Sequence, residues 1–216
     1  MRLGEPLAAL RVVRRAIRDG WDALFVVGAL NLAWLALSVT VVLLPPATVA
    51  LFESMDELAS GRTPGLREYF AFVRRRFLRA WIWALWAIAG ITIASVNVQY
   101  WNDTSGSFGW LSAVSAVIGL LFAVSLLYVW PFLFRQTEGG LGRAIRNSIL
   151  AVLAAPLFAL TLALAIAVLV AVSAILILPL AVFLTALLGL ISTHAVTDRL
   201  RAFGKLEPRA AVDEVD

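Results

Sequence analysis

Long apolar stretches separated by short polar segments dominate the chain. Four ranges carry no charged residue: 23–44, 81–98, 108–134 and 149–193. A helix that crosses a bilayer needs about 20 mostly apolar residues, because the hydrocarbon core is about 30 Å thick and the helix rises about 1.5 Å per residue. The last range is long enough for two crossings joined by a turn within residues 171–179. The pattern therefore predicts an all-α fold, a polytopic transmembrane helix bundle.

Six spans are expected, at residues 21–44, 46–60, 78–98, 108–134, 149–170 and 175–195. They form one integral membrane domain of residues 1–200, followed by a polar cytoplasmic tail at residues 201–216. Pro45 and Pro46 lack amide donors and have a fixed φ, which predicts a helix break between the first two spans. The second span is short and contains Glu53, Asp56 and Glu57, so five spans are the alternative.

The positions of the basic residues favour six spans, because loops rich in Lys and Arg stay in the cytoplasm. With six spans, both termini and all 18 Lys and Arg residues lie on the cytoplasmic side of the cell membrane. With five, the five arginines of the first 20 residues would face outward. Apolar residues recur at helical spacing in segments 7–18 and 66–81, which predicts two amphipathic helices on the inner leaflet.

The second amphipathic segment supplies the candidate residues for binding the inner leaflet or a cytoplasmic partner. These are Arg67, Arg74, Arg75, Arg76 and Arg79. Anionic lipid headgroups are the expected counterions, and nucleic acid is not expected because the arginines flank apolar runs. A role limited to fixing the topology is the simpler interpretation.

Composition argues against most enzyme chemistry. Hydrophobic residues make up 62% of the chain and charged residues 15%, with no cysteine and one histidine. We therefore expect no catalytic residues, no metal site, no cofactor and no enzyme activity. Glu53, Asp56 and Glu57 share a helix face and could hold a cation, or they could pair with arginines such as those at 74–76. His194 lies near Asp198, which suggests a proton relay only weakly.

Three polar residues of the first span are candidate intramembrane contacts, namely Asn31, Ser38 and Thr40. They could contact a neutral solute or hydrogen-bond to neighbouring helices. Apart from segment 46–60, no predicted span has an ionisable residue in its middle. Ion pathways usually need such residues, so an ion-coupled pump is disfavoured.

One part of the sequence resembles a known family. Residues 31–52, NLAWLALSVTVVLLPPATVALF, are followed by Gly61 and by LREYFAFVRRR at residues 66–76. This arrangement resembles the YesL family of bacterial membrane proteins of unknown function, over residues 28–80. Pro45 and the acidic patch at residues 53–57 depart from the family pattern. The resemblance implies an association with carbohydrate transport and supplies no catalytic residues.

Two functions are consistent with these observations. An accessory or scaffold membrane protein, associated with carbohydrate uptake and contacting transporter subunits, is favoured. A small transporter or channel for a neutral solute is the alternative.

Overall fold

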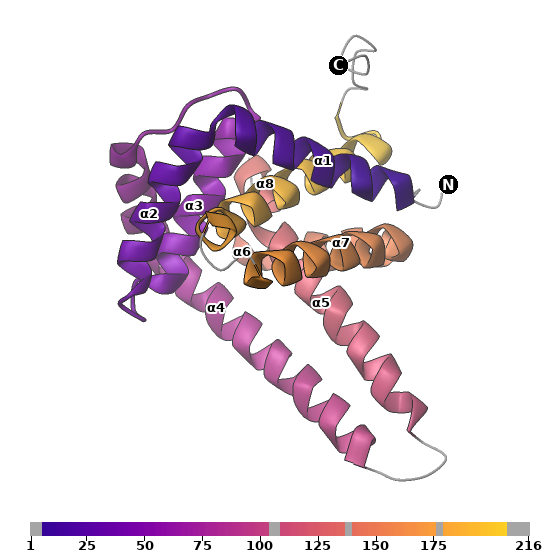
Figure 1. Cartoon of the computed structure of the whole chain (residues 1–216). Coiled ribbons are helices and arrows are strands. Elements are labelled where there is room, and N and C mark those ends of the chain that lie inside the picture. Colours follow the sequence, from indigo (N-terminus) through magenta and orange to yellow (C-terminus); the bar gives the residue numbers. More distant parts are fainter. Residues whose placement is uncertain (1–5, 104–108, 137–139, 176–178, 207–216) are drawn as a thin grey trace.

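The computed structural model describes residues 6–103, 109–136, 140–175 and 179–206 and places eight α-helices in them (Figure 1). Their bounds are Pro6–Asp22 (α1), Leu24–Ser38 (α2), Leu44–Ala59 (α3), Leu66–Asp103 (α4), Trp110–Arg135 (α5), Leu141–Ala154 (α6), Pro156–Ile175 (α7) and Pro179–Ala202 (α8). These described ranges contain no β-strand, which confirms the predicted all-α class.

The chain bends sharply between α1 and α2. The two helices meet at an angle of 92°, with Ala23 between them. One face of α1 is made of small residues and is buried in the fold, whereas Leu7, Leu10 and Trp21 on another face are exposed. The first predicted span, 21–44, therefore begins at this bend.

The break between α2 and α3 lies before the two prolines. α2 ends at Ser38, and a turn of residues 39–43 leads into α3. Pro45 and Pro46 occupy the first turn of α3. The first amides of a helix have no intrahelical acceptor, so proline is tolerated there at no cost in hydrogen bonds. The prolines thus begin a helix, and the preceding turn makes the break.

The α2–α3 hairpin packs beside the first half of α4. Near the hairpin tip, the Trp81 indole Nε1 donates a hydrogen bond to the Val42 carbonyl at 3.1 Å. Farther along α3 and α4, the Tyr69 hydroxyl of α4 donates to the Ala47 carbonyl of α3 at 3.2 Å. The hairpin tip therefore reaches the residue at which the uncharged part of α4 begins.

The longest helix, α4, has 38 residues. At about 1.5 Å per residue it is about 57 Å long, nearly twice the thickness of a hydrocarbon core. No break separates its arginine-bearing first half from its apolar second half. Segment 66–81, predicted to lie on the inner leaflet, therefore continues directly into the apolar part of the same helix.

The second half of α4 pairs with the start of α5, and this α4–α5 hairpin extends away from the other helices (Figure 1). Close packing within it depends on a glycine. A Cβ atom added at Gly90 would lie 2.2 Å from the Phe122 ring, much closer than atoms can approach. The missing side chain lets the two helices meet at this point.

A break at Ala155 separates α6 from α7. Ala155 has φ −144° and ψ 65°, outside the helical region, and Pro156 begins the next helix. A residue before proline is sterically disfavoured in the α conformation, which explains the break. The predicted span 149–170 therefore begins in α6. The turn predicted within 171–179 and the start of span 175–195 lie partly outside the described residues, as do residues 207–216 of the predicted tail.

Helix α3 lies at the centre of the fold. Every residue from Pro46 to Met55 except Thr48 is buried, and α3 packs against α2, α4, α5 and α8. The large side chains Tyr69, Trp130 and Phe158 complete the core around it. The end of α3 that carries the carboxylates is therefore enclosed by other helices.

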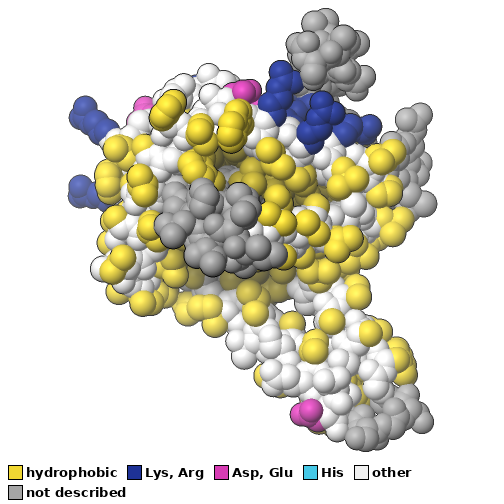
Figure 2. Space-filling model, in the orientation of Figure 1, with side chains coloured by type: hydrophobic (Ala, Val, Ile, Leu, Met, Phe, Trp, Pro, Cys, Tyr) yellow, Lys and Arg dark blue, Asp and Glu magenta, His cyan; other side chains and the backbone are white. Residues whose placement is uncertain are grey.

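Within the described residues, three helices are long and apolar enough to cross a membrane: α4, α5 and α7. A fourth crossing is possible if α1 and α2 form one bent span. α2 and α3 have 15 and 16 residues, about 22 and 24 Å, which is short of a full crossing. Hydrophobic side chains spread over the face drawn in Figure 2. The chain thus has the helices of a membrane protein, and the six-span arrangement stays a prediction.

Candidate functional site

A cluster of ion pairs joins α3 to its neighbours, and we call it the charged junction. Its centre is Glu53, a buried residue whose carboxylate faces two arginines of α4. Arg76 donates to both carboxylate oxygens, from Nε and from Nη2, each at 3.1 Å. Arg75 donates to the same carboxylate. These are two of the arginines that the sequence offered as partners for the acidic run.

The next carboxylate along α3 connects it to α5 and α8. Arg135, at the end of α5, places Nη2 3.2 Å from the Asp56 carboxylate and also donates to the Thr197 hydroxyl of α8. The Thr197 hydroxyl in turn donates to the Thr193 carbonyl at 2.7 Å. Glu57, the third acid, pairs with the exposed Arg62 at 3.2 Å. Each carboxylate of the acidic run therefore has its own arginine partner.

α1 is attached to α8 by a separate polar contact. The Nε2 atom of His194 lies 2.7 Å from an oxygen of Asp19, and the histidine side chain is nearly buried. Farther along α8, Arg199 contacts Asp198 and stacks 3.9 Å above the Phe158 ring of α7. The sequence suggested Asp198 as the histidine's partner, and the structure provides Asp19 instead.

This chemistry suits a clamp between helices. Glu53 and Asp56 join α3 to α4 and α5 through guanidinium groups of those helices. Charge-assisted, bidentate pairs of the kind made by Arg76 and Glu53 also fix the geometry of the groups they join. Across the residues that the structure describes, no three His, Cys, Asp or Glu side chains gather as a metal site would require.

The three candidate intramembrane residues are placed separately. Asn31 is fully buried, and its Nδ2 donates to the Val27 carbonyl of its own helix at 3.0 Å. Thr40 is exposed in the α2–α3 turn and donates to the Leu37 carbonyl at 2.8 Å. The Ser38 hydroxyl is enclosed and has no hydrogen-bond partner within the described part of the chain. None of the three lines either of the pockets described next.

An arginine pocket lies beside the charged junction on α4. It is an open depression along this one helix, with a volume of about 510 Å³, and it is lined by Arg75, Arg76, Leu78 and Arg79. Two further candidate arginines of this helix, at positions 67 and 74, are exposed and lie outside its lining. The structure thus divides the five arginines into three that share a pocket and two that do not.

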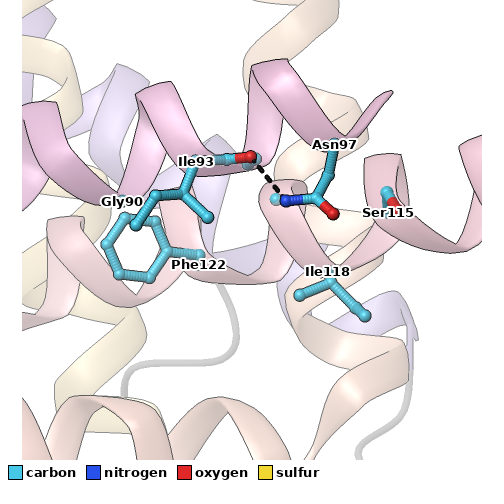
Figure 3. Close-up of a pocket in the computed structure, with 8 residues that line it drawn as sticks. Gly90, Ile93, Asn97, Ser115, Ile118 and Phe122 are labelled. Atoms are coloured by element: carbon cyan, nitrogen blue, oxygen red, sulfur yellow. Dashed lines mark hydrogen bonds between the residues drawn. The ribbon is translucent and has the colours of Figure 1, made fainter. Parts of the chain in front are cut away.

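A second pocket, which we call the hairpin groove, lies between α4 and α5 and has a volume of about 360 Å³. Its lining is mainly apolar, with the two polar side chains Asn97 and Ser115. These extend from facing helices on one side of the groove, and Gly90 and Phe122 lie at the other (Figure 3). The Asn97 amide nitrogen donates to the Ile93 carbonyl at 2.9 Å.

Sequence reasoning missed Arg135, Thr197 and Asp19. Arg135 is the single basic residue at the end of an apolar helix, and this isolated position could have indicated a buried ion pair. The hairpin groove was missed because Gly90 and Ser115 belong to separate apolar runs, and their meeting depends on how α4 and α5 pair.

A family model described as "Protein of unknown function, DUF624" matches residues 27–98, one third of the chain. The match covers most of α2, all of α3 and α4 through the end of its apolar stretch. It includes Glu53, its two arginine partners and Asn97, and it leaves out Arg135 and His194. No curated protein and no solved structure matches the chain.

Proposed function

We propose that this chain is an accessory or scaffold protein of the cell membrane, without enzyme activity, and that it binds a transporter subunit of a carbohydrate-uptake system. The α4–α5 hairpin is the docking element in this proposal. The observation that carries it is the hairpin groove, which holds an amide and a hydroxyl on a hairpin that few other helices cover.

Exposure of the hairpin is the first support. Leu85, Ile88 and Val96 of α4 are each more than half exposed, and so is Ile118 of α5. Lipid accommodates such side chains, so they need no protein neighbour. A hairpin that extends this far from the core contributes little to the packing of the rest of the fold. Its surface is therefore free to serve contacts with another membrane protein.

The polar lining of the groove is the second support. Helices in lipid associate through close packing and through hydrogen bonds between polar side chains, each worth on the order of 1 kcal/mol. The Asn97 amide nitrogen is engaged by its own helix, and the carbonyl oxygen of the same side chain points away from that bond (Figure 3). Together with Ser115 it offers a partner helix an acceptor and a hydroxyl.

Charge distribution supports the proposed orientation, with both termini in the cytoplasm. No Lys or Arg occurs between Arg79 and Arg135, the part of the chain that contains the apolar half of the hairpin. The basic side chains visible in Figure 2 lie in the upper half of the view, away from the hairpin. A cytoplasmic excess of basic residues would put the charged junction on the inner side of the membrane.

The link to carbohydrate uptake rests on the resemblance of residues 28–80 to the YesL family. Co-purification tests it together with the groove. Ser115→Leu fills the groove, and Val114→Leu places the same leucine side chain on an exposed neighbouring position outside it. Transporter subunits should co-purify with the native chain and with Val114→Leu and should be lost with Ser115→Leu. Equal retention by both variants, or a partner set without transporter subunits, would contradict the proposal.

The alternative, a small transporter for a neutral solute, has weaker support. Asn31 and Thr40 bond within their own segments, and neither described pocket includes them. Purified protein in liposomes that moved a neutral sugar, and stopped doing so after Asn31→Ala, would favour this alternative over the scaffold.

A further inference from the structure

We propose that the arginine pocket of α4 binds the phosphate group of an anionic lipid headgroup. This site is separate from the hairpin groove, and it does not depend on the scaffold function. Phosphate is the ligand chemistry that guanidinium groups match best, because their N–H fork can donate two parallel hydrogen bonds to its oxygens.

The pocket has an excess of positive charge. Three guanidinium groups line the pocket, and Glu53 is the one carboxylate that pairs with any of them among the described residues. The neighbouring carboxylate of Asp56 is held by Arg135, and that of Glu57 by Arg62. Arg75 and Arg76 share the one carboxylate of Glu53, so the three arginines keep a net charge of +2, which favours an anionic ligand.

The three arginines of the pocket have different roles. Arg76 has a side chain only 17% exposed, bonds to Glu53 in bidentate fashion and lies over the Phe134 ring at 5.7 Å. It is a positioning residue. Arg75 and Arg79 are exposed and stand four positions apart, so they share one face of the helix. These two side chains can turn to a phosphate between them.

The pocket lies where the charged part of α4 meets its uncharged part. Arg79 is the last charged residue before the uncharged stretch of the helix, and Trp81 follows two residues later. Arginine and tryptophan side chains concentrate where hydrocarbon meets headgroups. Leu78, which is 72% exposed, adds an apolar contact to the pocket lining. This boundary position favours a phosphate carried by a lipid over one dissolved in water and over an acidic protein segment.

Native mass spectrometry of the full chain, released from nanodiscs, tests the proposal. The nanodiscs contain phosphatidylglycerol and phosphatidylcholine in equal amounts. Arg79→Gln removes a pocket arginine, and Arg67→Gln removes an exposed arginine of the same helix outside the pocket. The native chain should retain phosphatidylglycerol in preference to phosphatidylcholine. Arg79→Gln should weaken that retention about tenfold, the usual size of one lost charge-assisted bond, and Arg67→Gln less than about twofold.

Three results would overturn the proposal. The first is no preference for phosphatidylglycerol in the native chain. The second is an equal loss in both variants, which would mean that diffuse attraction to the membrane surface accounts for the binding. The third is displacement of the lipid by inorganic phosphate at low millimolar concentration, which would identify a soluble phosphate as the ligand. Binding is measured without other proteins, so retention of the lipid also shows that no acidic protein partner is needed.

Discussion

Removing the charge of Glu53 should destabilise the fold far more than removing the charge of Glu57, four residues later on the same helix. Glu53 is 7% exposed and faces two arginines. In Glu53→Gln, the mostly buried Arg76 loses its counterion and remains charged beside a neutral amide. An uncompensated charge in a partly enclosed site costs several kcal/mol when one partner of a pair is removed.

The two ion pairs of Glu53 contribute unequally. The Arg75 side chain is 57% exposed, so its pair contributes at most about 1 kcal/mol. Most of the loss comes from Arg76, which is 17% exposed. Glutamine can still accept one hydrogen bond, and we expect the total loss to be about 2–3 kcal/mol. For a chain of this size that lowers the apparent melting temperature by about 5–10 °C.

Tryptophan fluorescence during heating in detergent measures the change. The matched control is Glu57→Gln, because its partner Arg62 has a side chain 71% exposed. The control should lower the apparent melting temperature by less than about 4 °C, since exposed pairs contribute about 0–1 kcal/mol. Equal shifts in the two variants would refute the claim that the charged junction holds the helices together, and so would a more stable Glu53→Gln protein.

Two further predictions concern helix packing. Gly90→Ala should lower the free energy of unfolding by about 1–3 kcal/mol, because the added Cβ atom would overlap the Phe122 ring. The control Gly142→Ala should be tolerated, because a Cβ atom added there has no neighbouring atom within 4 Å. Thermal unfolding in detergent compares them, and equal stability would argue against the close approach of α4 and α5. The chain has no cysteine, so a cysteine at Leu10, 50% exposed on α1, should react with a maleimide much faster than one at Val12, 6% exposed. Equal labelling rates would mean that α1 is not docked through its small-residue face.

Local patterns were enough to predict the helices that contain long apolar runs. The uncharged residues of α4, α5 and α7 stand out because the length of an apolar run is a property of consecutive residues. The ends of the shorter helices were harder to predict. α2 stops at Ser38 although the apolar run continues to Leu44, and the turn that follows is held by the distant Trp81. The break at Ala155 had a local signal in Pro156, which the continuous apolar run obscured.

The charged junction could be predicted only in part. The sequence offered two interpretations of the acidic run, a cation site or ion pairs with the arginines at 74–76, and Glu53 makes the ion pairs. This pairing could be predicted because only a short connection separates α3 from α4. The other contacts join residues that are far apart in sequence. Asp56 and Arg135 are separated by 79 positions, and Asp19 and His194 by 175. Such pairs depend on how whole helices pack, which hydropathy and spacing do not specify.

We propose that the α4–α5 hairpin crosses a membrane while the charged junction stays on one side of it. Single cysteines at Thr63, before α4, and at Asp103, at its end, test this directly with a membrane-impermeant maleimide applied to intact cells and to inverted vesicles. With this orientation, the cysteine at 103 should be labelled only in intact cells and the cysteine at 63 only in inverted vesicles. Labelling of both positions from the same side would contradict it.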